Sequence, residues 1–203
     1  MQANIYVDGF NLYYRALRRT HFKWLDLDAV CRRMLPEHTV HRIHYFTARI
    51  SARPNNPQES QRQDLYLRAL ETIPHLTITY GNFLTSKAWA PRADGQGMVQ
   101  VHKTEEKGSD VNLASLLVHD AHRHDFEIAA VLSNDSDLTL PLALVGSELG
   151  LPVVLLSPVR FPHNSLVSAA SEVRKIRSAQ LRACQFPARL VDAQGSFQKP
   201  PTW

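Results

Sequence analysis

The chain has 203 residues, a length that suits one domain, with or without a tail. Apolar residues make up 44% of it and charged residues 21%, which excludes a disordered chain. Its net charge of +4 allows a polyanionic partner without requiring one, and its longest apolar runs are too short to cross a bilayer.

The N-terminal half alternates between strand and helix patterns. The β-branched and aromatic run ANIYVD predicts a buried strand over residues 3–8, followed by helical spacing over 10–19. Residues 84–104 have no clear period and are expected to form a loop or hairpin over one edge of the sheet. Between these segments we expect a helix over 25–35, a strand over 40–50, a turn over 51–57, a helix over 58–73 and a strand over 76–83.

The C-terminal half continues this alternation. The continuous apolar run EIAAVLS predicts a strand over 127–133 that is buried on both faces. Beyond about residue 180 the chain becomes polar and Pro-rich, so we expect a main domain over 1–180 and a partly irregular extension over 181–203. The other predicted elements are a helix over 109–123 with Ser109 as its N-cap, a helix over 137–150 with Pro141 in its first turn, a strand over 151–157, and a helix with a short edge strand over 164–176.

Alternating strands and helices predict an α/β fold, with an open and mainly parallel sheet covered on both faces. Ligands bind such folds in the crevice beyond the carboxyl ends of the strands. The two cysteines, Cys31 and Cys184, match no zinc or redox spacing and are expected to be buried thiols in a reducing compartment. No targeting signal is visible, so we expect a cytoplasmic protein without membrane contact.

Four aspartates fall where this topology predicts a binding site. Asp8 ends the first strand, Asp135 and Asp137 follow the strand over 127–133, and Asp110 opens the helix that leads into that strand. Two carboxylates about 4 Å apart repel each other by about 4 kcal/mol at an effective dielectric constant near 20. A hard cation such as Mg²⁺ or Mn²⁺ would relieve this repulsion, and oxygen ligands suit it.

Asp135 and Asp137 alone also have a simpler interpretation as helix caps, and Asp110 as a partner of the helix dipole. Asp8 is harder to explain in this way, because it ends a buried strand before a Gly. One cap needs one acid, however, so the pair formed by Asp135 and Asp137 favours a functional role. Setting aside the four aspartates leaves 15 acidic residues against 23 basic ones, a net charge of +8 for the rest of the chain. A basic surface around an acidic pit is what a nuclease requires.

The segments IYVDGFNLYY, EKGSDVNLA, VLSNDSDLTLPL and GLPVVLLSP together resemble the NYN domain family (LabA-like) of the PIN-like ribonuclease superfamily. The resemblance covers roughly residues 3–175. It implies a Rossmann-like three-layer α/β/α sandwich and a metal-dependent endoribonuclease with an Mg²⁺ or Mn²⁺ site. The residues that match the family's site are Asp8, Asn11, Asp110, Asp135 and Asp137.

The sequence departs from the family pattern at two places. Asn134 stands where Gly is common, and Ser115 and Leu116 stand where many members carry a further Asp in the helix. Glu106, close in sequence to Asp110, is a candidate to compensate for that acid. The departure keeps a second hypothesis open, an RNA-binding module with a degenerate or inactive site. A different metal-dependent phosphohydrolase fits less well, because Phe10 stands where the haloacid-dehalogenase pattern needs a second Asp.

Basic and polar residues near these acids are candidates for substrate contacts. We expect Lys107, Lys103, Arg49 and Ser136 to contact the RNA, with Lys107 the strongest candidate because it adjoins Asp110. Exposed aromatic side chains could stack on unpaired bases. The expected partner is therefore single-stranded or structured RNA, and a homodimer is left open.

Overall fold

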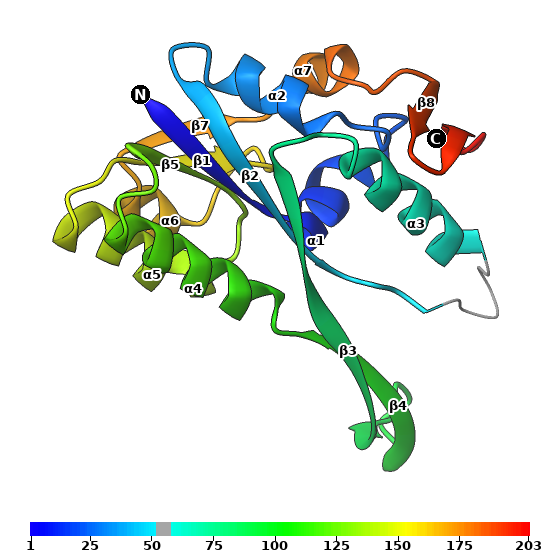
Figure 1. Ribbon diagram of the computed structural model, residues 1–203. Helices are drawn as coiled ribbons and strands as arrows, with labels where there is room; N and C mark the ends of the chain where they lie inside the picture. Colours follow the sequence, from blue (N-terminus) through cyan, green and yellow to red (C-terminus); the bar gives the residue numbers. More distant parts are fainter. Residues whose placement is uncertain (52–57) are drawn as a thin grey trace.

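The computed structural model describes residues 1–51 and 58–203. Within these residues, a seven-stranded sheet with strand order β4-β3-β2-β1-β5-β6-β7 forms the middle layer (Figure 1). Every pairing in it is parallel except that of β3 with β4. The strands are β1 (Gln2–Asp8), β2 (Thr39–Ala48), β3 (Leu76–Pro91), β4 (Met98–Lys107), β5 (Ile128–Leu132), β6 (Val153–Ser157) and β7 (Glu172–Lys175).

Helices cover both faces of this sheet, which completes the three-layer α/β/α sandwich expected from the sequence (Figure 1). One face is covered by α1 (Gly9–Leu12), the π-helical turn η1 (Tyr13–Leu17), α2 (Leu27–Met34), α3 (Gln58–Leu70) and α7 (Ser178–Ala183). The other face is covered by α4 (Ser109–His122), α5 (Thr139–Ala143), η3 (Leu144–Glu148) and α6 (Asn164–Ala169).

The two faces have separate cores because successive strand residues point to opposite sides. In β1, Ile5 and Val7 belong to the first core, under α1, α2 and α3, whereas Tyr6 belongs to the second, under α4. Each buried side chain of this size contributes about 1.5–3 kcal/mol to folding. The strand that carries Asp8 is therefore fixed from both sides.

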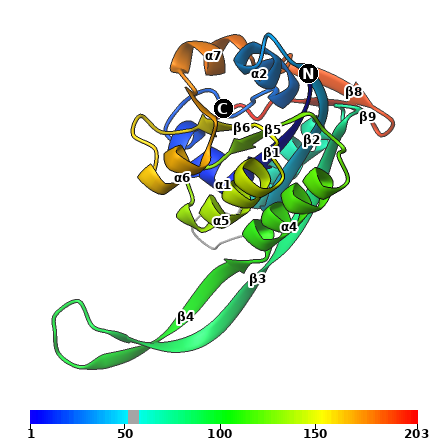
Figure 2. The ribbon, with the colours of Figure 1, turned by 90° about the vertical axis from the view of Figure 1, so that its left-hand side faces the viewer.

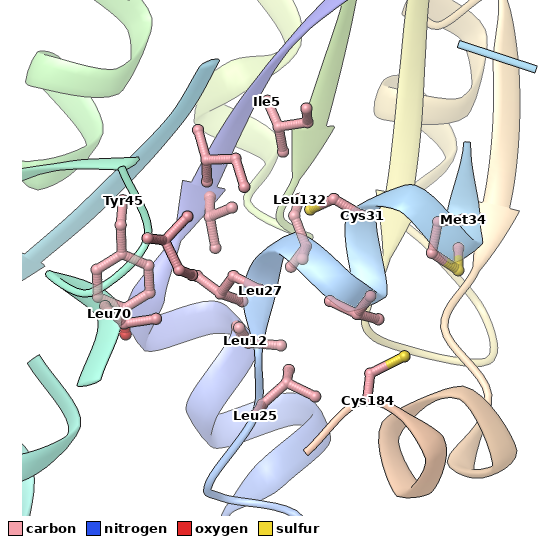
Figure 3. Packing of buried hydrophobic residues seen from close by; sticks show 14 of the residues in the cluster. Ile5, Leu12, Leu25, Leu27, Cys31, Met34, Tyr45, Leu70, Leu132 and Cys184 are labelled. Atoms are coloured by element: carbon pink, nitrogen blue, oxygen red, sulfur yellow. The ribbon is translucent and has the colours of Figure 1, made fainter. Parts of the chain in front are cut away.

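The first core extends to the C-terminal segment. Figure 3 shows Cys31 of α2 and Cys184, which follows α7, among its side chains. Both thiols are buried and free, as the sequence predicted. Trp203, near the end of the chain, packs against Tyr66 with ring centroids 5.9 Å apart. Two further strands, β8 (Arg189–Asp192) and β9 (Gly195–Gln198), form a separate hairpin, so the segment after residue 180 lies packed against the domain.

Several predicted boundaries differ from the structure. The helix expected over 10–19 is a short α-helix followed by the π-helical turn η1. The helix expected over 137–150 is divided into a 3₁₀ turn, η2 (Ser136–Leu138), then α5 and η3, with Pro141 in the first turn of α5. The N-cap of α4 is Gly108 rather than Ser109, because the Ser109 hydroxyl bonds back to Glu106 instead of capping the helix.

Residues 84–104 form a hairpin, which is one of the two forms expected, but β3 and β4 project beyond the body of the protein as a long arm (Figures 1 and 2). The strand predicted over 76–83 therefore continues to Pro91. Gly95 and Gly97 in the connecting turn have φ values of +71° and +88°, which favour glycine. The turn expected over 51–57 lies almost wholly outside the described residues. In the part of the chain that the structure describes, no helix is long and apolar enough to span a bilayer.

Candidate active site

The carboxyl ends of β1 and β5 place Asp8 beside Ser133. The two strands are parallel neighbours with Val7 opposite Leu132, so the next residue of each chain lies at the same edge of the sheet. Asp8 is only 4% exposed. Its Oδ2 accepts a hydrogen bond from Ser133 Oγ at 2.8 Å, and its Oδ1 accepts one from the Asn11 amide at 2.9 Å. The second bond makes Asp8 the N-cap of α1.

Ser133 also connects this carboxylate to the Asp-Ser-Asp segment. The Asp135 amide donates to Ser133 Oγ at 3.1 Å, so one buried hydroxyl joins the two aspartates. Asp135 Oδ1 in turn accepts a hydrogen bond from the Asp137 amide at 3.0 Å and caps η2. The simpler interpretation of Asp135 as a cap is thus correct, but the cap leaves Asp137 and Ser136 exposed at the same edge.

Asn11 and Asn134 form a second link across this edge. Asn11 Oδ1 accepts a hydrogen bond from the Asn134 amide at 3.3 Å. The side chain of Asn134, where the family commonly has Gly, accepts from the His163 amide at 2.9 Å. Because His163 is the N-cap of α6, this bond holds the start of α6 beside the loop after β5. The departure from Gly therefore adds a structural contact.

Asp110 lies in the first turn of α4 and is influenced by the other acids. Burial raises its pKa to about 6, with further increases from Asp8, Asp135, Glu106 and Asp137 in that order. Burial also raises the pKa of Asp8, against the lowering effect of the hydrogen bonds from Asn11 and Ser133. Asp110 therefore lies within electrostatic reach of Asp8, Asp135 and Asp137.

Neither Glu106 nor Leu116 replaces the further Asp that many family members carry in this helix. Glu106 Oε2 accepts a hydrogen bond from the Ser109 hydroxyl at 2.7 Å, and its Oε1 accepts one from the Ser109 amide at 3.1 Å, so it satisfies the start of α4. Leu116 packs against the second core. It lies six residues beyond Asp110, about 9 Å further along the helix at 1.5 Å per residue.

The carboxylate oxygens at this edge determine whether it suits a divalent cation. Among the described residues, no three His, Cys, Asp or Glu side chains are arranged as direct ligands of one ion. Mg²⁺ commonly takes only one or two carboxylates and keeps several waters, and its ligands are oxygen atoms. The aspartates at this edge supply oxygen only, and burial, with the repulsion of the neighbouring carboxylates added to it, raises the pKa of Asp110. Their chemistry therefore fits a hydrated hard cation.

The residues predicted to contact RNA are spread over the edge of the sheet and the arm formed by β3 and β4. Lys107 ends β4, three residues before Asp110, and its Nζ lies 3.4 Å from Glu105. Lys103 is exposed further out on β4 and pairs with the same glutamate at 2.6 Å. Arg49 follows β2, pairs with Asp64 at 2.7 Å and stacks over the Tyr80 ring at 4.9 Å. Each is accessible, and each already has an acidic neighbour.

Two features of this site were not predicted from the sequence. Ser133 was treated only as the end of a strand, although a polar residue closing the apolar run EIAAVL is a signal for a buried hydrogen bond. The second is a cavity of about 100 Å³ that starts at Gly9, next to Asp8 in the sequence, and has six aromatic residues in its lining. The sequence pattern of Phe10, Tyr13 and Tyr14 does not show that residues from η1, β2, α3 and Trp203 enclose a cavity together.

Comparison with known proteins identifies a family and proteins of similar sequence or fold. The model of the NYN domain matches residues 2–177. The 6-hydroxy-3-succinoylpyridine 3-monooxygenase HspA of Pseudomonas putida (strain DSM 28022 / S16) is 29% identical over 238 residues, covering 100% of this chain and 75% of that protein. A protein of unknown function from Vibrio parahaemolyticus RIMD 2210633 has a TM-score of 0.59 at 18% identity, covering 87% of this chain and 93% of that one, and shares the fold.

Proposed function

Since the chain belongs to the NYN domain family, which is nuclease-like, we propose that it is a metal-dependent endoribonuclease acting at the acidic sheet edge. The observation that carries this proposal is the link from Asp8 through Ser133 to Asp135, with Asp110 close enough for its pKa to respond to both aspartates.

The chain's own residues divide the work as follows. Asp110, Asp135 and Asp137 would hold the ion with Asp8, directly or through water, because only Asp8 of these four has both carboxylate oxygens engaged in hydrogen bonds among the described residues. When bound, Mg²⁺ or Mn²⁺ would ease deprotonation of water and stabilise charge on the phosphodiester. Asn11 orients Asp8 through its amide and the loop after β5 through its side chain.

Positively charged side chains would hold the RNA backbone near these acids. Lys107 stands at the base of the arm, with Lys103 further along it, so a strand of RNA could follow β4 toward Asp110. Ser136, exposed between the two acids, can donate a hydrogen bond to a phosphate oxygen. Water would attack the phosphorus atom, leaving a 5′-phosphate and a 3′-hydroxyl.

The test is cleavage of RNA with Mn²⁺ and with EDTA, by the wild type and by Asp8→Asn and Asp137→Asn. We expect EDTA and either substitution to lower the rate by at least about 100-fold, a loss typical of removed catalytic groups. Glu148→Gln is the matched control, because Glu148 is exposed in η3, away from this edge. Full activity of both aspartate variants would overturn the proposal.

The absence of the family's helix acid at Leu116 favours one alternative, an RNA-binding module without cleavage. Calorimetric titration with Mn²⁺ separates the two. A nuclease should bind the ion and lose that binding in Asp110→Asn, whereas a module that binds RNA but gives no heat with Mn²⁺ has lost the metal site.

A second candidate function comes from the relative named as a 6-hydroxy-3-succinoylpyridine 3-monooxygenase, whose alignment covers the whole chain. The aromatic residues in the lining of the cavity that starts at Gly9 favour a ring-shaped substrate. The name of that relative places the new oxygen on ring carbon 3, which carries the succinoyl group. Such a reaction would add one oxygen atom of O₂ to that carbon, break its bond to the succinoyl group, which would leave as an aldehyde, and reduce the other oxygen atom to water, with four electrons from a nicotinamide donor. The check is consumption of 6-hydroxy-3-succinoylpyridine with NADH, FAD and O₂. No consumption would remove this candidate.

A further inference from the structure

A cavity with six aromatic residues in its lining lies beside α1, the helix that follows Asp8. Gly9 and Phe10, the two residues after Asp8, form part of its wall. The other walls come from η1, β2, α3 and the C-terminal Trp203, so the cavity joins segments far apart in the sequence. We call it the aromatic cavity and define it by Phe10, Tyr13, Tyr45, Tyr66 and Trp203 with Lys23.

Its volume limits what it can hold. The cavity measures about 100 Å³. It is smaller than an apolar cavity of about 150 Å³ that binds benzene, so this partly open cavity can take at most one six-membered ring and excludes two fused rings. Both a pyrimidine and a pyridine meet this limit, whereas a purine exceeds it.

The walls are suited to an aromatic ligand. Tyr66 lies between Tyr45 and Trp203, with ring centroids 6.4 Å and 5.9 Å away, both edge-on. Elsewhere in the lining, Tyr13 packs edge-on against Tyr14, with ring centroids 5.2 Å apart. Rings held by rings in this way keep their positions, and each aromatic contact is worth about 0.5–1.5 kcal/mol beyond the area it buries.

Polar groups in the cavity are available to orient a ligand. Tyr45 is almost completely buried, and its hydroxyl has no hydrogen-bond partner among the described residues. Lys23 donates a hydrogen bond to the Thr20 carbonyl oxygen at 2.9 Å. Among the residues that the structure describes, no acidic side chain lies within ion-pair distance of Lys23. Arg62 and Glu59 also line the cavity, so it carries a net charge of about +1.

We propose that the aromatic cavity binds one six-membered heteroaromatic ring that carries an anionic group, with the ring among the tyrosines and the anion toward Lys23. Two sources share this chemistry: a pyrimidine nucleotide of an RNA substrate and a free aromatic carboxylate. If the ligand is a nucleotide of RNA, the inference rests on the proposed nuclease function. The cavity would then hold one base next to the phosphodiester bond that is cleaved. The chain would then prefer pyrimidine over purine at that position.

The test measures binding without cleavage, by calorimetry on the full chain in EDTA with uridine 5′-monophosphate, pyridine-3-carboxylate and adenosine 5′-monophosphate. We expect at least one of the two single-ring ligands to bind about tenfold or more tightly than the adenine nucleotide. Uridine nucleotide binding identifies RNA as the source, and binding of pyridine-3-carboxylate alone identifies the free acid. Equal binding of the adenine nucleotide, or no binding of any probe, would overturn the proposal.

Variants locate the site. Tyr13→Ala and Lys23→Met should each weaken binding by about tenfold, whereas Trp89→Ala, on the arm and 65% exposed, should leave it unchanged. Lys23→Met keeps the aliphatic stem, so it remains informative if Tyr13→Ala does not fold. Binding that survives in Lys23→Met and in folded Tyr13→Ala would contradict the assignment. Because the titrations are carried out in EDTA, they measure binding in the absence of metal and do not depend on whether the chain cleaves RNA.

Discussion

Ser133 Oγ donates a hydrogen bond to Asp8 Oδ2 at 2.8 Å while it accepts one from the Asp135 amide at 3.1 Å. A single fully buried hydroxyl thereby fixes the distance between the end of β1 and the loop after β5. A carboxylate that is 4% exposed would otherwise leave one oxygen without a partner. Ser133 is a positioning residue, since it acts through the two aspartates.

Replacing Ser133 by Ala should weaken both the fold and the site. The loss leaves Asp8 Oδ2 and the Asp135 amide without these partners, which costs about 1–3 kcal/mol for a buried polar group. It also removes a hydrogen bond that lowers the pKa of Asp8, so that pKa should rise further and Mn²⁺ should bind more weakly at neutral pH. Urea unfolding and calorimetric Mn²⁺ titration measure the two effects. Ser115→Ala, at an exposed position of α4, should change neither, and an unaltered Mn²⁺ affinity in Ser133→Ala would show that the hydroxyl does not position the acids.

Asp110 should destabilise the metal-free protein above about pH 6. Its pKa of about 6 in the folded chain lies above the ordinary 3.8, so the folded state binds more protons between these values and stability falls as pH rises through them. Asp110→Asn should therefore raise the free energy of unfolding at pH 8 in EDTA by about 1 kcal/mol, a value discounted for the solvent screening of a half-exposed group. Below pH 3.8 the gain should disappear.

Binding of Mn²⁺ should reverse the stabilising effect of Asp110→Asn. Mn²⁺ stabilises whichever state binds it, and Asp110→Asn removes a proposed ligand, so in excess Mn²⁺ the wild type should become the more stable of the two. Thermal unfolding at pH 8, once in EDTA and once in Mn²⁺, shows which of the two proteins is more stable in each condition. A variant that is stabilised equally in both conditions would show that Asp110 contacts no ion. Glu148→Gln should show no effect of either kind.

The central layers of the fold could be predicted because they depend on local patterns. Buried runs such as EIAAVLS can only be strands covered on both faces, and alternation with helices orders them into a parallel sheet. The π-helical turn at Tyr13–Leu17 and the length of the arm could not be predicted in this way. In the arm, residues 84–91 continue β3 through pairing with β4 rather than through a buried face, so periodicity carried no signal.

The site was predictable where it follows from topology and not where it depends on packing. Asp8, Asp110 and the Asp135–Asp137 pair each adjoin the carboxyl end of the sheet, which connectivity alone determines. The bridging role of Ser133 requires the register of β1 with β5, and the aromatic cavity requires Trp203 to return to η1. Neither contact has a local signature in the sequence.

His44 should make the protein less stable in mild acid. Burial lowers its pKa, against the opposing effect of Asp120 at 3.6 Å, and neither ring nitrogen has a hydrogen-bond partner among the described residues. The other groups facing it are Tyr6, stacked at 5.2 Å, and the charges of Arg42 and Asp125. Because the unfolded chain binds the proton more tightly, stability should fall as pH drops below the ordinary histidine pKa of about 6.5.

His44→Phe keeps a ring against Tyr6 and removes the titration, so its unfolding free energy should depend less on pH between 7.5 and 5.5 than that of the wild type. The comparison is urea unfolding at both values. His122→Phe, on the exposed surface of α4, is the control and should keep the slope of the wild type. Equal slopes for His44→Phe and the wild type would assign the acid sensitivity to other groups.

Gly9 should not tolerate a side chain, because it joins the proposed catalytic strand to the aromatic cavity. A Cβ at this position would lie 2.6 Å from Tyr45 Oη and 2.8 Å from the Phe46 carbonyl oxygen, both inside van der Waals contact. Gly9→Ala should therefore displace Tyr45 and lower the free energy of unfolding by about 1–3 kcal/mol. Gly146→Ala is the matched control, since its Cβ would come no nearer than 3.6 Å to the Ala169 carbonyl oxygen, and alanine favours a helix over glycine by up to about 1 kcal/mol. Urea unfolding should separate the two variants in opposite directions, and a Gly9→Ala protein as stable as the wild type would mean that Tyr45 can move away without cost.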